Sequence, residues 1–525
     1  MQRIHIIGAG LAGLSAAVTL GAAGIPCHLI SLQPSERAQS VLAEGGINAA
    51  LDTMGEGDTP EQHFQDTMRG GVYLADPNAV ANLTGGAPEI VRRLESLGVP
   101  FNRGEHDLIL RNFGGQKRKR TAYAKSSTGK IIMTALIDEA RKYEAAGLIR
   151  RLPHHAFLRL MMENGQCTGV RIRDCYSGMT ADLPGTVLLC SGGMNGLFPG
   201  MTTGTTQNSG DVTAAVFAQG AALGNPEMLQ YHPTTVGIPG KRMLVTEAAR
   251  GEGGRLYILR GGKKWYFMEE LHPELGNLSP RDVVARTMYF VRREHGGSVY
   301  LDMTALPEET WQKKLSDLRE EIVHYLALDP KTEPIPVQEG IHYFMGGIDT
   351  DAEHRTNLPG LYAAGECTCQ YHGANRLGGN SMLGALYGGR RAAQTILREG
   401  LQEAPDQQPE FREMPDALDA PASPGFIRRV SDILLSGLGI VRNEQALDAA
   451  LGALARLHPE NAREENRLVL AQAMLLGARE RRESRGAHYR EDYPQQDDSL
   501  RKTTVAVFAD GQVHVTFRPL PERRM

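Results

Sequence analysis

The chain has 525 residues, which is more than one hydrophobic core usually holds, so we expect two to four domains. Its 41% hydrophobic and 22% charged residues are ordinary for a globular enzyme, and a formal net charge of −4 provides no overall basic field for a nucleic acid. No apolar run approaches the roughly 20 residues that a bilayer crossing needs, so we expect no direct membrane span.

The N-terminal segment predicts a βαβ unit. Residues 3–8 are a short apolar run ending in Gly8, residues 11–23 are small and apolar, and residues 26–31 predict a second strand. The turn between the first strand and the helix has the GxGxxG spacing of Gly8, Gly10 and Gly13. Such glycines permit a tight turn and let a pyrophosphate approach the helix N-terminus. This segment therefore predicts a dinucleotide site, and its start so close to Met1 leaves no room for a signal peptide, which favours a cytoplasmic protein.

The end of the second predicted strand argues against a nicotinamide dinucleotide. A nicotinamide site typically has an acid about 20 residues after the glycines, where this chain reads Ser31-Leu32-Gln33. The sequence also has no second GxGxxG motif that could accept a nicotinamide donor.

The rest of the chain suggests an interrupted nucleotide domain. The β-runs at 186–190 and 361–364 lead into glycine-rich turns and are expected to return to the first sheet. Charged helices and three chemical motifs lie between them, which indicates an inserted substrate domain. The predicted order is a nucleotide domain over 1–225 and 346–403, a capping domain over 226–345, a proline-rich linker over 404–424, a helical domain over 425–500, and a C-terminal tail over 501–525 with a strand-like piece at 503–518.

The cysteines predict no metal site. None of the six forms a CxxC, a haem attachment sequence or an iron–sulfur series, and Cys367 and Cys369 are expected to be buried thiols. Any electrons that this chain exchanges with something besides its substrate would therefore come through a partner.

Motifs along nearly the whole chain resemble those of one family, the flavoprotein subunit of succinate dehydrogenase and fumarate reductase, which also includes L-aspartate oxidase. The matching pieces are GAGLAG (8–13), AEGGINAA (43–50), DTMRGG (66–71), FGG (113–115), TG (128–129), QYHPT (230–234), TEAARGEGG (246–254), SPRD (279–282), HYFMGGI (342–348), GECTCQYHGANRLGGNS (365–381) and ESRGAHYREDYP (483–494). The resemblance implies an α/β fold with a Rossmann-like FAD-binding domain, an inserted capping domain and a C-terminal helical domain.

The resemblance also implies FAD contacts. Membrane-bound members carry a histidine that bonds covalently to the flavin, and Gln39 occupies that position here. Glutamine has no nucleophile for such a bond, so we expect non-covalent FAD; the alternative is a link through another histidine such as His63. Glu366 resembles the acid that binds the ribityl chain, and the alternative is an N-cap-type charge. The implied FAD contacts are Gly8, Gly10, Gly13, Ser31, Gln39, Ser40, Ala43, Gly45, Gly46, Asp211, Glu366, Arg376, Ser381 and Leu383.

A third set of residues suits a dicarboxylate, because arginine and histidine donors grip carboxylates with strong, directional hydrogen bonds. By resemblance, His342 and Arg376 bind one carboxylate, His232 and Thr246 bind the other, and Phe113 packs the substrate against the flavin. Arg281 resembles the residue that delivers a proton, and Glu247 and Arg250, three residues apart on one helical turn, resemble its relay. Taken alone, His232 could be a turn or core residue, and Arg281 could form a surface pair with Asp282. Glu247 and Arg250 could form a salt bridge on a helix. Their joint occurrence in family order favours the functional interpretation.

Three alternatives stay open. In L-aspartate oxidase a glutamate precedes the two glycines where this chain has Phe113, which offers no charge to an ammonium group. Gln39 argues against a succinate dehydrogenase proper without excluding it, since both directions share one site. Loss of Arg281 or Glu247 would point to a non-catalytic flavin-binding or assembly protein, but both residues are present. We therefore predict a fumarate reductase-type flavoprotein that acts on fumarate and succinate, with an iron–sulfur subunit as the electron supplier, in the cytoplasm or membrane-associated through partner subunits.

Overall fold

A five-stranded parallel sheet forms the centre of the nucleotide-binding region, with strand order β19-β10-β1-β2-β6. The computed structural model describes residues 3–125, 127–400 and 409–524. The predicted βαβ unit is confirmed, and the two later β-runs join the same sheet as expected. The elements are β1 (Ile4–Ile7), α1 (Leu11–Ala22), β2 (Cys27–Ser31), β6 (Ile149–Pro153), β10 (Thr186–Leu189) and β19 (Leu361–Ala363).

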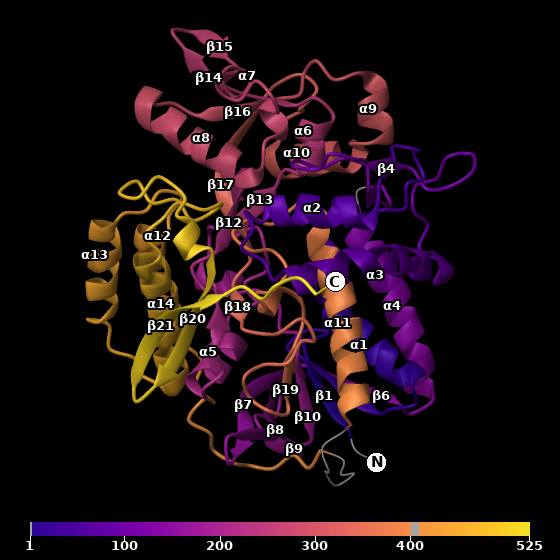
Figure 1. Cartoon of the computed structure of the whole chain (residues 1–525), viewed down its shortest axis with the longest axis vertical. Helices are drawn as coiled ribbons and strands as arrows, with labels where there is room; N and C mark the ends of the chain where they lie inside the picture. The colour runs from indigo at the N-terminus through magenta and orange to yellow at the C-terminus, as the bar shows by residue number, and fades with distance from the viewer. Residues whose placement is uncertain (1–2, 126, 401–408, 525) are drawn as a thin grey trace.

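Helices and the small sheet of β7, β8 and β9 pack against this central sheet (Figure 1). Helix α1 packs against α4 and α11, and α11 also contacts α3, so that small apolar residues of α1 lie fully buried between sheet and helices. The elements are β3 (Ile47–Asn48), α2 (Pro60–Gly70), α3 (Pro77–Ser96), β4 (Leu110–Arg111), β5 (Thr121–Ala122), α4 (Thr128–Ala145), β7 (His155–Glu163), β8 (Gln166–Asp174), β9 (Thr180–Pro184), α5 (Asp211–Ala218) and α11 (Asn380–Glu399).

Residues 226–345 hold a second, antiparallel sheet of six strands, with order β13-β12-β17-β16-β14-β15, at the top of Figure 1. Five helices pack on it around a separate core that includes Trp311 and Phe267. The long strands β12 and β17 reach from this cap towards the nucleotide-binding region. The elements are β12 (Leu229–Ile238), β13 (Lys241–Leu244), α6 (Glu247–Gly251), β14 (Arg255–Arg260), β15 (Lys263–Trp265), α7 (Phe267–Leu271), α8 (Arg281–His295), β16 (Val299–Asp302), α9 (Glu308–Lys313), α10 (Ser316–Leu326) and β17 (Ile335–Phe344).

The C-terminal region combines three helices with a hairpin. Helices α12 (Pro424–Gly437), α13 (Glu444–Leu454) and α14 (Ala462–Glu480) pack together, and α14 also packs on α5. The strand-like piece expected at 503–518 is the hairpin of β20 (Lys502–Ala509) and β21 (Gln512–Pro519).

This hairpin does not form the separate tail that was expected over 501–525. Strand β20 pairs with β11 (Leu223–Gly224), which pairs in turn with β18 (Gly347–Ile348). The pairing satisfies backbone groups that an isolated hairpin would leave at a sheet edge. It ties the C-terminus to the segments on both sides of the cap.

The predicted linker lies along the surface of the β7-β8-β9 sheet. Its residues 404–408 lie outside the described part of the chain. From residue 409 onward, Arg412 exchanges backbone hydrogen bonds with Thr180, and Asp416 forms an ion pair with Arg171 at 3.2 Å. Side-chain and backbone contacts therefore hold 409–423 against the sheet.

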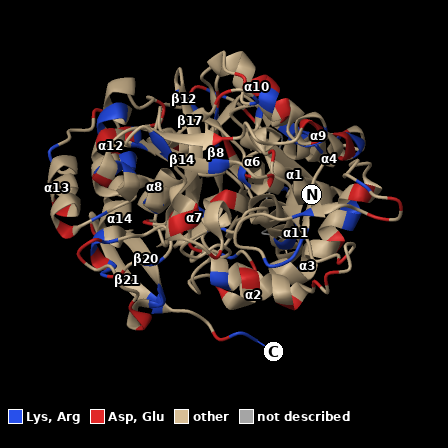
Figure 2. Cartoon of the chain, turned by 90° about the horizontal axis from the view of Figure 1, so that it is seen from above, with Lys and Arg blue, Asp and Glu red and all other residues tan. Residues whose placement is uncertain are grey.

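Basic and acidic residues are interspersed along the ribbon in the view of Figure 2. Within the described ranges, no helix combines the length and the apolar character that a bilayer crossing requires. No cluster of three His, Cys, Asp or Glu side chains in those ranges is placed to hold a metal ion.

Candidate active site

A cavity of about 730 Å³ runs from the turn between β1 and α1 to strands β12 and β17 of the cap. It brings together most residues that the sequence predicted. Those that line it are Gly8, Gly10, Ser31, Gln39, Ser40, Ala43, Gly45, Gly46, Phe113, Asp211, His232, Thr246, Glu247, Arg281, His342, Glu366, Arg376 and Ser381. Three predicted residues, Gly13, Arg250 and Leu383, are not among the lining residues.

The glycine turn is shaped by close backbone contacts. Gly8 has φ +116°, and a Cβ there would overlap the carbonyl oxygen of Cys190. A Cβ at Gly13 would overlap the carbonyl oxygen of Gly8, so Gly13 allows α1 to pack directly on the end of β1. Leu383 is fully buried in α11 and belongs to the core between α11 and the sheet. Gly13 and Leu383 therefore contribute to the packing of α1 and α11 next to the cavity and do not line it.

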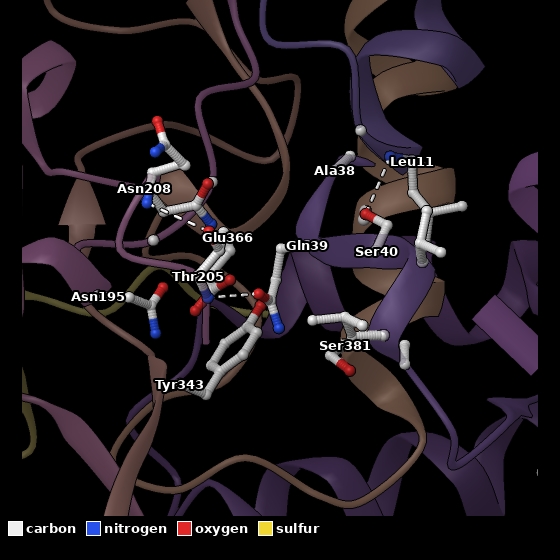
Figure 3. A pocket seen from close by; sticks show the side chains of 18 of the residues that line it. Leu11, Ala38, Gln39, Ser40, Asn195, Thr205, Asn208, Tyr343, Glu366 and Ser381 are labelled. Carbon is white, nitrogen blue, oxygen red and sulfur yellow. Dashed lines mark hydrogen bonds between the residues drawn. The ribbon is translucent and has the colours of Figure 1, made fainter. Parts of the chain in front are cut away.

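The start of α1 faces the cavity as a phosphate-binding helix start does. The backbone N–H of Leu11 donates to Ser40 Oγ at 3.2 Å, and Ser40 comes from the short helix over Gln39–Leu42 (Figure 3). Glycine at positions 8 and 10 leaves space for a ligand to approach the backbone. The residues present fit the pyrophosphate of a dinucleotide such as FAD.

Gln39 lines the cavity beside the loop that follows β10. Its Oε1 accepts the backbone N–H of Thr205 at 2.6 Å (Figure 3). His63, the alternative candidate for a covalent link, is fully buried and is not among the lining residues. Its Nε2 lies 3.0 Å from Asn380 Oδ1.

Glu366 projects into the cavity from the turn after β19 (Figure 3). Its Oε1 accepts the backbone N–H of Phe344 at 3.2 Å, so the carboxylate binds a different strand and does not cap its own short helix. Burial raises the pKa of Glu366 to about 7, although the Phe344 N–H and Arg376 oppose the shift. A carboxyl group with such a pKa suits hydrogen bonding to hydroxyl groups of a cofactor.

Two histidines face each other at the other end of the cavity. His232 lies on β12 and His342 on β17, with ring centroids 5.1 Å apart. Pro233 cannot donate to the β-ladder, and the register of β12 shifts between His232 and Thr235. Burial, together with Arg281, lowers the pKa of each histidine well below its ordinary value. Both rings are therefore neutral near pH 7 and each carries one N–H.

The predicted relay is assembled next to these histidines. Arg281, the first residue of α8, donates from Nε and Nη2 to Glu247 Oε2 at 2.9 and 2.6 Å. Arg250 Nη2 lies 3.8 Å from Glu247 Oε1, and Arg250 is not among the residues that line the cavity. The three residues are 2–8% exposed. Burial alone would raise the pKa of Glu247, but Arg281 and Arg250 hold it below its ordinary value.

The sequence analysis missed Gln230, which joins two of the arginines. Its Oε1 accepts from Arg281 Nη1 and from Arg376 Nη2, both at 3.1 Å. Its Nε2 donates to Asn375 Oδ1 at 2.9 Å and to the Arg376 carbonyl at 3.0 Å, which fixes the orientation of the amide. The signal was present, because Gln230 is the first residue of the QYHPT motif.

Thr203 and Tyr343 were also missed. Thr203 Oγ1 lies 2.7 Å from His342 Nδ1, and the Tyr343 ring lies under the Arg376 guanidinium at 4.4 Å. Burial, reinforced by Arg281, lowers the pKa of Arg376 to about 9. Tyr343 stands within the HYFMGGI motif, whereas Thr203 lies outside the quoted motifs.

This end of the cavity is suited to a small dianion. The guanidiniums of Arg281 and Arg250 lie beside the Glu247 carboxylate, and Gln230 joins Arg281 to Arg376. Three cations and one carboxylate leave a surplus of two positive charges. Within the described residues, His232 Nε2 and Arg376 Nε are buried and have no hydrogen-bond partner. Buried donors without acceptors are costly, and carboxylate oxygens would satisfy them.

Comparison with known protein families identifies the class of this protein. A family model described as FAD binding domain matches residues 4–382, and one described as fumarate reductase flavoprotein C-term matches residues 460–525. The chain is therefore an FAD-dependent oxidoreductase, and the cavity described above is where its residues fit that cofactor.

Relatives define the family more closely. The chain is 34% identical to a succinate dehydrogenase flavoprotein subunit of Bacillus subtilis, over 96% of this chain and 93% of that protein. It is 36% identical to an L-aspartate oxidase of Caulobacter vibrioides, over 97% and 96%. The fold resembles E. coli quinol fumarate reductase FrdA with a TM-score of 0.86 and 28% identity, over 99% and 97% of the two chains. The chain belongs to the family of succinate dehydrogenase and fumarate reductase flavoprotein subunits.

Proposed function

We propose that this chain reduces fumarate to succinate. The observation that carries the proposal is the buried contact of Arg281 with Glu247, next to two neutral histidines and the guanidinium of Arg376. Bound FAD, once reduced, supplies a hydride. The other requirements are a grip on both carboxylates and a proton source, and this chain's own side chains provide them.

Binding uses the surplus charge. Arg376 and His342 take one carboxylate, and His232 and Thr246 take the other, because each pair offers donors directed into the cavity. Phe113 is 6% exposed and packs close to Gly45, so it holds the carbon chain of the substrate at the cofactor end of the site. A dianion that is bound at each end by one of these pairs of residues is held in one orientation.

Proton delivery uses the relay. With reduced FAD bound, hydride addition at one alkene carbon would send the π electrons to the other carbon, and the Arg281 guanidinium would give that carbon a proton. A guanidinium ordinarily stays protonated, so Arg281 acts as an acid only if it is reprotonated at once. Glu247, which is ionised at rest, would take a proton from Arg250, 3.8 Å away, and pass it to Arg281, from which its Oε2 accepts two hydrogen bonds.

Gln39 supports non-covalent FAD and the reductive direction. Its amide occupies the cavity wall and its Oε1 is used by the Thr205 N–H, so no nucleophile is offered there. Acid precipitation of the purified protein is expected to release FAD into the supernatant. Flavin that stays on the polypeptide would overturn this part of the proposal.

An iron–sulfur subunit is the proposed electron supplier, and the complex is placed in the cytoplasm or at the membrane through its partners. The relatives supporting this are named as subunits, such as the 8-methylmenaquinol:fumarate reductase flavoprotein subunit of Wolinella succinogenes. Co-purification of the chain from its source with a protein that shows iron–sulfur absorbance would support the assignment.

L-Aspartate oxidase is the competing function, since relatives with that name share 34–36% identity. One assay separates the two. We expect rapid oxidation of a reduced viologen dye by fumarate, and no hydrogen peroxide from L-aspartate and oxygen. The reverse result would replace fumarate reduction with aspartate oxidation.

A further inference from the structure

The two site histidines differ in how their tautomers are set. His232 Nδ1 accepts the backbone N–H of Thr234 at 3.3 Å. A backbone N–H can only donate, so the proton of neutral His232 lies on Nε2. His342 Nδ1 instead faces a hydroxyl, Thr203 Oγ1, at 2.7 Å. A hydroxyl can donate or accept, so the tautomer of His342 depends on what Thr203 does.

The backbone holds Thr203 in place beside His342. The N–H of Ile341 donates to the Met201 carbonyl at 2.8 Å, and the N–H of Thr203 donates to the Ile341 carbonyl at 2.9 Å. Thr202 forms a parallel bridge with Ile341 between them. The loop after β10 is thus attached to β17 one residue before His342, and Thr203 is 8% exposed.

Two acceptors compete for the Thr203 hydroxyl proton. The carbonyl oxygen of Ile341 lies 3.5 Å from Oγ1, beyond the usual range for a hydroxyl, whereas His342 Nδ1 lies at 2.7 Å. The hydroxyl therefore donates to Nδ1. Nearby Arg281 and Arg376 disfavour a second proton on the ring. The single ring proton is left on Nε2.

We propose that Thr203 is a positioning residue that sets the tautomer of His342, so that Nε2–H is presented to a substrate carboxylate. The proposal rests on the proposed function for the identity of that ligand. It makes both histidines of the site donors through Nε2, one held by a backbone amide and the other by a side-chain hydroxyl. Only the second can be removed by substitution of a single side chain.

The kinetic test compares three variants of the holoprotein. Thr203→Val removes the hydroxyl at nearly constant volume, Thr203→Ser keeps it, and Thr84→Val makes the same change in a buried helical threonine of α3 that is not among the lining residues. With reduced viologen, we expect Thr203→Val to raise the KM for fumarate about tenfold, with a smaller effect on kcat. Thr203→Ser and Thr84→Val are expected to match the wild type, and all four proteins to keep equal FAD absorbance.

The spectroscopic test reads the tautomer directly. Holoprotein labelled with 15N-histidine gives the ring nitrogen shifts, and His342→Gln assigns the His342 signals. We expect protonated Nε2 and unprotonated Nδ1 in the wild type, and a mixture of tautomers in Thr203→Val. Protonated Nδ1 in the wild type, or an unchanged spectrum and unchanged KM in Thr203→Val, would overturn the proposal.

The tautomer measurement also separates the proposal for Thr203 from the proposed function. If the wild type neither turns over fumarate nor shifts its flavin absorbance with succinate, the proposed function fails. The tautomer remains measurable in that case, and loss of the Nε2–H form in Thr203→Val would still support the role of Thr203.

Discussion

Two buried arginine clusters of this chain use their donors in different ways. The substrate-site cluster consists of Arg250 and Arg281 beside Glu247, together with Arg376, which Gln230 joins to Arg281. The C-terminal cluster lies in and around the ESRGAHYREDYP motif and consists of Arg481, Arg485 and Arg490 with Glu227, Glu483 and Asp492.

Pairing is complete at Arg481 of the C-terminal cluster. All five of its N–H groups donate, to Glu227, Glu483, two backbone carbonyls and the Thr504 hydroxyl, at 2.7–2.9 Å. In the substrate-site cluster, Arg376 Nε and Arg250 Nε are buried without a hydrogen-bond partner among the described residues. Donors that are all paired stabilise the fold, whereas the unpaired Nε of Arg376, a residue that lines the cavity, is available to a ligand.

The first and largest test removes the proposed acid. Arg281→Ala is expected to lower kcat for fumarate by about 10³-fold or more, because it removes the proposed acid that Glu247 holds through two hydrogen bonds. FAD absorbance is expected to stay, since Arg281 lies on the cap. Steady-state assay with reduced viologen measures the effect.

The control for this test is Arg293→Ala on the same helix. Arg293 is more than half exposed and pairs with Glu491 on the surface. Its variant is expected to retain wild-type kcat. Normal turnover in Arg281→Ala would show that another residue is the acid.

The second test breaks the C-terminal cluster. Glu483→Gln removes the buried countercharge of Arg485 and one of the two buried countercharges of Arg481, which keeps Glu227, so we expect the free energy of unfolding to fall by about 3–5 kcal/mol. Glu491→Gln makes the same change in an exposed pair of the same motif and is expected to cost at most about 1 kcal/mol. Denaturant unfolding measures both. Equal stability losses would remove the distinction between saturated buried pairs and surface pairs.

The sequence allowed prediction where a short motif carries the chemistry. The βαβ unit follows from hydrophobic runs and the spacing of Gly8, Gly10 and Gly13, and the structure places strands and helix where these patterns predict them. The charged residues of the site were predicted because separate motifs contribute them: TEAARGEGG contributes Glu247 and Arg250, and SPRD contributes Arg281. Their distances could not be read from spacing, since Glu247 and Arg281 lie on different helices.

Contacts that depend on tertiary structure escaped prediction. Thr203 reaches His342 only because backbone hydrogen bonds attach its loop to β17. The C-terminal hairpin was expected as a tail, because pairing with β11 requires a partner strand about 280 residues earlier in the chain. Gln230 was passed over in favour of His232, although a buried amide is the group that can accept from two arginines at once.

The third test changes the charge surplus. Phe113→Glu adds a carboxylate to a site with two surplus positive charges, which leaves one. We expect the KM for fumarate to rise about tenfold, because a dianion loses more attraction than L-aspartate, which carries a net single negative charge. Binding of L-aspartate, followed by flavin absorbance, is expected to become detectable.

Phe113→Leu serves as the uncharged control for this substitution. It removes the ring next to Gly45 and keeps the charge surplus. We expect it to weaken fumarate binding less than Phe113→Glu does. Equal effects of the two variants would show that packing, and not charge, governs the choice of substrate.

The smallest expected effect is a pH dependence of succinate binding. We assign it to the ionisation of one group, Glu366. Burial and Arg281 keep His232 and His342 neutral between pH 6 and 8, so neither ring changes charge in this range. The pKa of Glu366 is raised to about 7 by burial, and this group interacts with Arg376. Its carboxyl is mostly neutral at pH 6 and mostly ionised at pH 8. The added negative charge offsets part of the positive charge of Arg376.

The dissociation constant of succinate is therefore expected to rise about threefold from pH 6 to pH 8. Flavin absorbance titrations measure it, and Glu366→Gln with FAD still bound is expected to give a flat profile. If tightening at acid pH persists in Glu366→Gln, a histidine gains a proton in this range. The site would then bind its dianion with a cationic imidazole. The inference that His232 and His342 are neutral donors, and the contrast with the fully paired C-terminal cluster, would then be wrong.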